Sequence, residues 1–150
     1  MKQPISIDPL AFIILLFCGI VLYIFFRRRY RVHKRSADLR IPDTIGSEAI
    51  EIPLLESFCG IRGWGLFSIA DNAFNPRLAL HNEWMEYRVL AVRSANYGSI
   101  ESLRLIRFFF VHITLFTFRD RGLTFAAQVA DRQTLEKLAV FFGRKGVEIR

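Results

Sequence analysis

The sequence predicts an α+β chain that is mainly β, with one N-terminal transmembrane helix, a set of antiparallel strands and one C-terminal helix. Three observations predict it. Residues 10–26 contain no charged side chain. From residue 58 onward, short apolar runs alternate with clusters of Gly, Pro, Asn and Asp, which is typical of strands and turns. Near the C-terminus the apolar residues recur at intervals of three and four, which indicates an amphipathic helix.

The apolar run LAFIILLFCGIVLYIFF, residues 10–26, predicts a single membrane span. Its 17 residues would form a helix of about 25 Å at ~1.5 Å per residue, close to the roughly 30 Å hydrocarbon core of a bilayer. A secretory signal has its positive charge before the apolar run and a small-x-small cleavage site after it. Here the cations follow the run, so we expect a stop-transfer anchor with a short extracytoplasmic N-terminus, residues 1–9.

Basic side chains directly after the apolar run set the expected orientation. Lys and Arg stay on the cytoplasmic side of a membrane. We therefore expect a single-pass protein of the cell inner (cytoplasmic) membrane with residues 27–150 in the cytoplasm. Tyr23 and Tyr30 fit the interfacial aromatic positions of the span. The cations expected to contact the membrane surface, where they also attract anionic lipid, are Arg27, Arg28, Arg29, Arg31, Lys34 and Arg35.

The distribution of charge argues against a nucleic-acid partner. Of the net charge of +7, residues 27–40 carry seven Lys or Arg and one Asp, whereas residues 41–150 carry 13 Lys plus Arg against 12 Asp plus Glu. A nucleic-acid-binding domain usually has a basic face that raises its own net charge. Cys18 lies in the apolar run and Cys59 in the soluble part, so we expect no disulfide between them in a reducing cytoplasm.

Residues 27–57 are interpreted as a basic juxtamembrane segment and linker, and residues 58–150 as a cytoplasmic domain. Pro42, Gly46 and Pro53 favour an extended tether over 36–57, with a short helix at 47–52 as an alternative. The strand candidates are Gly65–Ile69, Arg77–Leu80, Met85–Val92, Ser102–Phe109, His112–Phe118 and Leu123–Val129.

The last two strands and the segment after them show the clearest local signals. RDRG, residues 119–122, joins two apolar runs of similar length, so a β-hairpin is expected, with Gly122 supplying a positive φ. Asp131 is a good N-cap for a helix that ends near Phe142, with Gly143 as its stop. The expected apolar stripe of this helix is Leu135, Leu138, Ala139 and Phe142.

The order of these elements resembles a known family. MEYRVLAV at 85–92, YGSIESLRL at 97–105, the hairpin and the helix DRQTLEKLAVFF at 131–142 together resemble the pleckstrin-homology-like (PH-like) superfold, particularly bacterial PH-like domains attached to membrane spans. The resemblance implies a bent antiparallel barrel with one end plugged by the helix. It also implies a further N-terminal strand, which would fall at Ile50–Leu55, and binding of a lipid headgroup or a protein.

The sequence contains only weak candidates for a catalytic motif. His33 lies in the basic segment, His81 in a turn and His112 in a strand, and none has convergent partners in the sequence. Gly60, Gly63 and Gly65 look faintly like a phosphate loop, but no helix or Lys-Ser/Thr pair follows. We therefore expect no enzyme, catalytic residue, metal, cofactor or small-molecule substrate.

The leading expectation is a non-catalytic interaction module, a scaffold at the cytoplasmic membrane face that binds a protein partner or helps assemble a membrane complex. One alternative is lipid binding, in which anionic headgroups are bound by the basic segment and by candidate rim contacts at Arg93, Arg119 and Arg121. Another is a small structural subunit that packs its span on others through Cys18 and Gly19. The run Arg107–Phe118 predicts a strand buried on both faces, or one lying against a partner or lipid.

Overall fold

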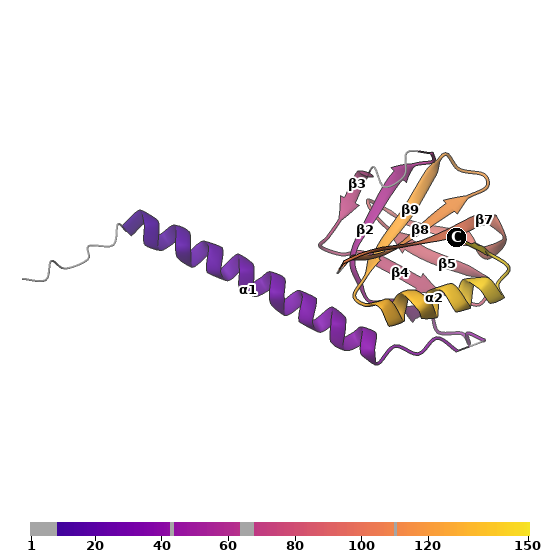
Figure 1. Ribbon diagram of the computed structural model, residues 1–150, viewed down its shortest axis with the longest axis horizontal. Helices are drawn as coiled ribbons and strands as arrows, with labels where there is room; N and C mark the ends of the chain where they lie inside the picture. The colour runs from indigo at the N-terminus through magenta and orange to yellow at the C-terminus, as the bar shows by residue number, and fades with distance from the viewer. Residues whose placement is uncertain (1–8, 43, 64–67, 110) are drawn as a thin grey trace, which may run out of the picture. The chain divides into compact units, whose positions relative to one another are not determined.

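The computed structural model describes residues 9–42, 44–63, 68–109 and 111–150 (Figure 1). The chain divides into two compact units, Met1–Arg31 and Val32–Arg150. The expected N-terminus before Pro9 and residues 64–67, which include the start of the strand predicted at Gly65–Ile69, lie outside the described residues. The elements are α1 (Pro9–Ala37), β1 (Ile50–Glu51), β2 (Leu54–Ile61), β3 (Ser68–Asn72), β4 (Arg77–Leu80), β5 (Trp84–Arg88), β6 (Val92–Asn96), the 3₁₀ turn η1 (Tyr97–Ser99), β7 (Ile100–Phe108), β8 (Val111–Phe118), β9 (Leu123–Val129), α2 (Arg132–Arg144) and β10 (Glu148–Ile149).

Helix α1 contains the apolar run and continues through the basic residues to Ala37. It begins at Pro9, where the first helical turn needs no N–H donor. Its 29 residues reach about 43 Å at ~1.5 Å per residue, and the side chains of residues 10–26 are exposed. The helix is long and apolar enough to cross a membrane. It extends 11 residues beyond Phe26, where the predicted span ends.

The described strands form two sheets rather than the closed barrel that the resemblance implied. The four-stranded sheet has the order β1-β4-β5-β6, and the six-stranded sheet has the order β10-β7-β8-β9-β2-β3. Neighbouring strands are antiparallel except for β10, which is parallel to β7. Strand β2 pairs with β3 on one side and with β9 on the other. Strands from the beginning and from the end of the β region therefore lie next to each other in this sheet.

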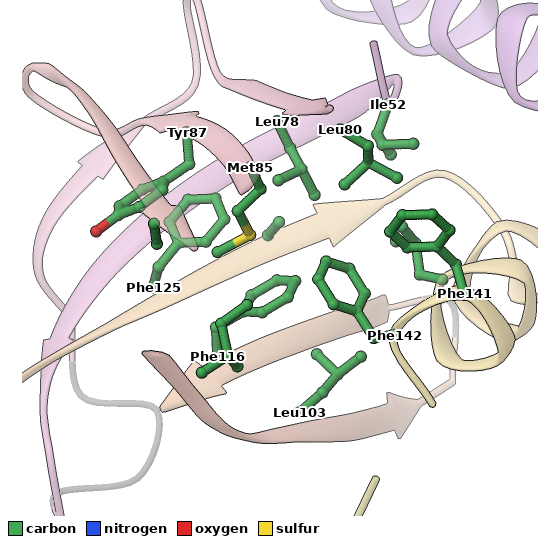
Figure 2. Packing of buried hydrophobic residues seen from close by; sticks show 14 of the residues in the cluster. Ile52, Leu78, Leu80, Met85, Tyr87, Leu103, Phe116, Phe125, Phe141 and Phe142 are labelled. Atoms are coloured by element: carbon green, nitrogen blue, oxygen red, sulfur yellow. The ribbon is translucent and has the colours of Figure 1, made fainter. Parts of the chain in front are cut away.

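The core lies between the two sheets and is closed by α2. Figure 2 shows Leu103 and Phe116 from the six-stranded sheet turned toward Phe142 of α2, and Met85 from the four-stranded sheet pointing into the same cluster. The ring centroids of Phe116 and Phe142 are 5.0 Å apart. Side chains alternate along a strand. Ile113 and Leu115 therefore point to the other face of β8, where they belong to a second apolar cluster on the six-stranded sheet. The prediction of a strand buried on both faces is therefore confirmed for residues 113–116 and is wrong for residues 107–109, which are exposed.

Helix α2 follows the prediction at its start and differs at its end. The Asp131 side chain accepts a hydrogen bond from the Thr134 backbone N–H at 2.7 Å, as expected of an N-cap. The helix runs to Arg144, and Gly146 with φ of 80° supplies the left-handed turn, while the Val147 N–H donates to the Phe142 carbonyl. Gly143 therefore does not end the helix. On the apolar stripe, Phe141 and Thr134 are buried while Ala139 is only half-buried.

The strand predictions hold best where local signals are strong. Arg77–Leu80 and Leu123–Val129 match β4 and β9, and the hairpin pairs Thr117 with Thr124 as expected. Gly122, however, does not have the positive φ assigned to it. The predicted strand Met85–Val92 is two strands, because a turn at 89–91 separates β5 from β6.

The segment 36–57 is packed where a tether was expected. Leu39, Ile45, Ile52 and Leu54 all lie in the core cluster, and the Ile52 N–H donates to the Leu78 carbonyl at 2.8 Å. The missed signal is the alternation of apolar residues at 50, 52 and 54, which places β1 and the start of β2 against the core. The short-helix alternative at 47–52 is also wrong, because β1 occupies that position.

Candidate functional site

A cavity of about 200 Å³ lies between the two sheets, lined by β2, β3 and β9 on one side and by β5, β6 and their connection on the other. Space remains there because several of the side chains that line it are small, among them Cys59, Ala70 and Ala91. Larger apolar side chains such as Val89 and Phe125 complete most of the wall. A mainly apolar concavity with a few polar groups is the usual form of a ligand or partner site.

Two arginines, Arg93 on β6 and Arg121 in the β8–β9 turn, are among the residues that line this cavity, and Arg93 is exposed while Arg121 is half-buried. Arg121 donates from Nη1 to the Tyr87 hydroxyl at 2.7 Å and from Nη2 to the Ser94 carbonyl at 3.1 Å. Its guanidinium carbon also lies 5.2 Å from the centroid of the Phe118 ring. These contacts hold the Arg121 side chain across the gap between the sheets.

The cavity carries positive charge that is not neutralised. Among the residues that the structure describes, neither Arg93 nor Arg121 forms an ion pair with a carboxylate, and no Asp or Glu lines the cavity. Charge–charge interactions are stronger beside low-dielectric walls than in open water. The arrangement therefore favours an anionic group presented together with apolar surface.

The titratable neighbours of these arginines stay neutral at pH 7. Burial raises the pKa of the Cys59 thiol, against the opposing effect of the Arg93 charge. Burial likewise raises the pKa of Tyr87, against the charge of Arg121 and its hydrogen bond, and the charge of Arg93. A neutral thiol and phenol leave the two guanidinium groups to set the charge of the cavity.

The third candidate rim contact, Arg119, lies apart from the cavity. Its side chain is exposed, and its backbone N–H donates to the Ser99 carbonyl at 2.9 Å. The structure thus brings Arg93 and Arg121 to one cavity and leaves Arg119 outside it.

The six candidate membrane-surface cations lie on α1. Residues 27–35 cover about two and a half turns at ~3.6 residues per turn, so their side chains point around the helix rather than along one face. Arg28 and Arg29 are half-buried and the other four cations are exposed, as are Tyr23 and Tyr30. Their roles at a membrane stay predictions.

His81 lies in the turn before β5 and His112 lies in β8, and each has one buried ring nitrogen without a hydrogen-bond partner among the described residues. The His81 ring stacks on Trp84 with centroids 3.7 Å apart, and His112 pairs with Arg107 across β8 and β7. Within residues 9–42, 44–63, 68–109 and 111–150, no three His, Cys, Asp or Glu side chains are grouped as a metal would need. Of the glycines that look like a phosphate loop, Gly60 lies in β2 and Gly63 in the turn after it, and Gly65 lies outside the described residues.

Sequence reasoning missed a set of exposed apolar side chains on strand connections. Leu90 in the β5–β6 turn is 81% exposed and also lines the cavity, and Phe74 in the β3–β4 turn is 98% exposed. Phe108 and Phe109 at the β7–β8 tip are 66% and 82% exposed. For Phe74 the available signal was its place inside the turn sequence DNAFNP, residues 71–76, whereas no local signal separates Phe108 and Phe109 from the apolar strand before them.

No protein-family model matches this chain, and no curated protein matches it.

Proposed function

We propose that this chain is a membrane-anchored, non-catalytic interaction module that binds a protein partner or helps assemble a membrane complex. In this proposal α1 spans the inner membrane once and Val32–Arg150 faces the cytoplasm. The span is supported by the exposed apolar side chains of α1, which only a bilayer or other helices would cover. The orientation rests on the basic residues that follow Phe26.

The observation that carries protein binding is the apolar border of the cavity. Leu90 and Ile69 line the cavity and are 81% and 58% exposed. Large exposed apolar side chains beside a concavity are typical of a docking site. With Arg93 and Arg121 at the same place, the site suits a partner segment that combines aliphatic and acidic side chains.

We also propose that Val32–Arg150 is PH-like. The supporting features are the antiparallel pairs β5–β6, β7–β8 and β8–β9, the return pairing of β9 with β2, and the C-terminal helix α2 packed against the six-stranded sheet. Fold similarity does not choose between headgroup and protein binding, so the choice made here comes from the cavity.

Site-specific photo-crosslinking in intact membranes tests the leading function. A photoreactive amino acid replaces Leu90 in one variant and Val140, which is 55% exposed on α2, in a control. We expect a discrete protein adduct at position 90 that is weakened by Arg93→Glu and absent at position 140. If position 90 gives no protein adduct, or only the adducts seen at position 140, protein binding at this cavity is refuted.

A second candidate function, binding of an anionic lipid headgroup, is favoured by the lack of an ion-pair partner for Arg93 and Arg121 among the described residues. A phosphate would accept hydrogen bonds from both guanidinium groups. In this reading the partner is the membrane itself, and the apolar lining covers the upper part of an acyl chain.

Thermal unfolding of the full chain in zwitterionic nanodiscs tests this second function. Titration with a short-chain anionic lipid should raise Tm, because a ligand that binds only the folded state stabilises it. Arg93→Gln should abolish the shift, whereas Arg119→Gln, which lies outside the cavity, should keep it. Equal shifts in both variants would point to non-specific attraction and exclude this site.

A further inference from the structure

Among the described residues at the tip of the hairpin formed by β7 and β8, Phe108 and Phe109 have exposed aromatic side chains. Phe108 is the last residue of β7 and is 66% exposed, and Phe109 follows it at 82%. The two rings form an edge-to-face pair with centroids 4.7 Å apart and an interplanar angle of 86°. We refer to Phe108 and Phe109 as the aromatic tip. It leaves a large apolar surface in contact with water, which is unfavourable unless something covers it.

The fold gains little from a phenylalanine at position 109. Its backbone has φ of 48°, a left-handed conformation that costs a non-glycine residue roughly 1–2 kcal/mol. Because the side chain is largely exposed, burial within the chain does not offset that cost. Glycine or asparagine would serve the turn better, so the advantage of an aromatic ring here has to come from outside the folded unit.

The surroundings of the tip combine apolar and cationic side chains. Ile106 and Val111 continue its apolar surface down the hairpin as half-buried members of the second cluster. Arg104 on β7 is exposed, and Arg107 is 46% exposed, with Glu136 as its nearest carboxylate at 3.9 Å. Aromatic rings flanked by arginine are suited to the interface of a membrane, where the ring enters the acyl boundary and the guanidinium stays with the headgroups.

Arg107, the residue before the tip, is connected through α2 to the place where the chain enters the folded unit. Glu136 on α2 contacts Arg107, and the next residue, Lys137, donates from Nζ to the Leu39 carbonyl at 2.7 Å. Leu39 is buried in the core and lies 13 residues after Phe26. That length of chain, mostly helical, reaches about 20–25 Å, so the chain enters the folded unit within that distance of the apolar run.

From these observations we propose that the aromatic tip inserts into the lipid surface, at the headgroup–acyl boundary of the membrane that α1 crosses, with Arg104 and Arg107 on anionic headgroups. The chain then contacts the bilayer at two places, its span and this hairpin. The inference rests on the proposed membrane anchoring. It differs from the headgroup binding considered above, because the tip and the cavity involve different residues.

Depth-dependent quenching in the full chain tests this inference. In a Cys18→Ala, Cys59→Ala background, Phe109→Cys is labelled with an environment-sensitive fluorophore and reconstituted at low protein density into anionic liposomes that contain nitroxide-labelled lipid. The control is Asp120→Cys, in the exposed turn at the other end of β8. The eight residues of β8 place it about 25 Å away at ~3.3 Å per residue. Unlabelled lipid and the cysteine-free chain give the baselines.

We expect the label at position 109 to shift to the blue and lose most of its emission to the lipid quencher, and the label at position 120 to behave as in water. Adding Phe108→Ser should reduce the quenching at position 109. Replacing Arg104 and Arg107 by Gln should reduce it chiefly in anionic liposomes.

Each contrary outcome has a separate meaning. If the chain resists carbonate extraction but the label at position 109 is no more quenched than that at position 120, the tip does not insert, and the proposed anchoring stands. A blue shift without lipid quenching means that protein, including a second copy of this chain, covers the tip, which overturns the lipid assignment. If carbonate releases the chain, the anchoring fails and this inference fails with it.

Discussion

Replacing Phe142 by alanine tests whether α2 closes the space between the sheets. The Phe142 side chain is fully buried, and its ring lies 5.0 Å from that of Phe116, 5.4 Å from Phe141 and 5.6 Å from Tyr97. Truncating a buried phenylalanine costs about 3–5 kcal/mol, because apolar burial is lost and a cavity remains. We expect a value near the upper end, since three aromatic neighbours lose their contact with the ring at once.

The assay is urea unfolding of the full chain in detergent micelles, followed by near-UV circular dichroism, which reports the packing of aromatic side chains. The control is Val140→Ala on the same helix, where 55% of the side chain is exposed and we expect a change within about 0.5 kcal/mol. The denaturant midpoint should fall for Phe142→Ala with little change in the slope.

A loss of stability below about 1 kcal/mol for Phe142→Ala would refute the packing of α2 described above, because truncating a fully buried aromatic side chain lowers the free energy of unfolding by more than that. It would mean that α2 does not pack into the space between the sheets. The same conclusion would follow if Val140→Ala were as destabilising as Phe142→Ala.

Three further predictions concern the start of α2, the cavity and the orientation. Asp131→Ala should lower the free energy of unfolding by about 1 kcal/mol, because the Thr134 N–H loses its capping partner, and Asp131→Asn should largely retain it; matched urea titrations measure both. Cys59 should alkylate slowly at pH 7 and faster as the pH approaches its raised pKa. Since its pKa is higher in the folded state than the ordinary 9.0, its contribution to stability is present below pH 9.0 and is lost as the pH rises through the folded value, which unfolding titrations at several pH values check. A reporter fused after Arg150 should be active in the cytoplasm, and activity on the outer side would contradict the orientation.

Much of the secondary structure could be predicted, because its signals are local. The hairpin of β8 and β9 and the start of α2 depend on alternation, turn residues and an N-cap within a few positions of each other. The strand that the resemblance implied at Ile50–Leu55 is divided between β1 and the first two residues of β2. The rest of β2 was missed because Pro53 and the acidic residues near it indicate a loop, whereas pairing with β9 and β3 makes it a strand. Tertiary contacts override local preference at such positions.

The candidate site could be predicted only in part. Charge and position in turns suggested Arg93 and Arg121, but Arg119 has the same local signals and lies elsewhere. The difference arises from packing, since the cavity is built by residues from both sheets that are far apart in sequence. The exposure of Phe109 could not be predicted for a similar reason: an apolar residue at the end of an apolar strand is normally taken as core.

The pairing of β2 with β9 has a consequence for the synthesis of this chain. Leu54 pairs with Val129, so β2 leaves the ribosome long before its partner. At about 5–20 residues per second the delay is several seconds. During that time the edge of β2 that will pair with β9 stays unpaired, even once β3 has paired with the other edge. An unpaired strand edge can associate with other chains until translation passes the end of β9.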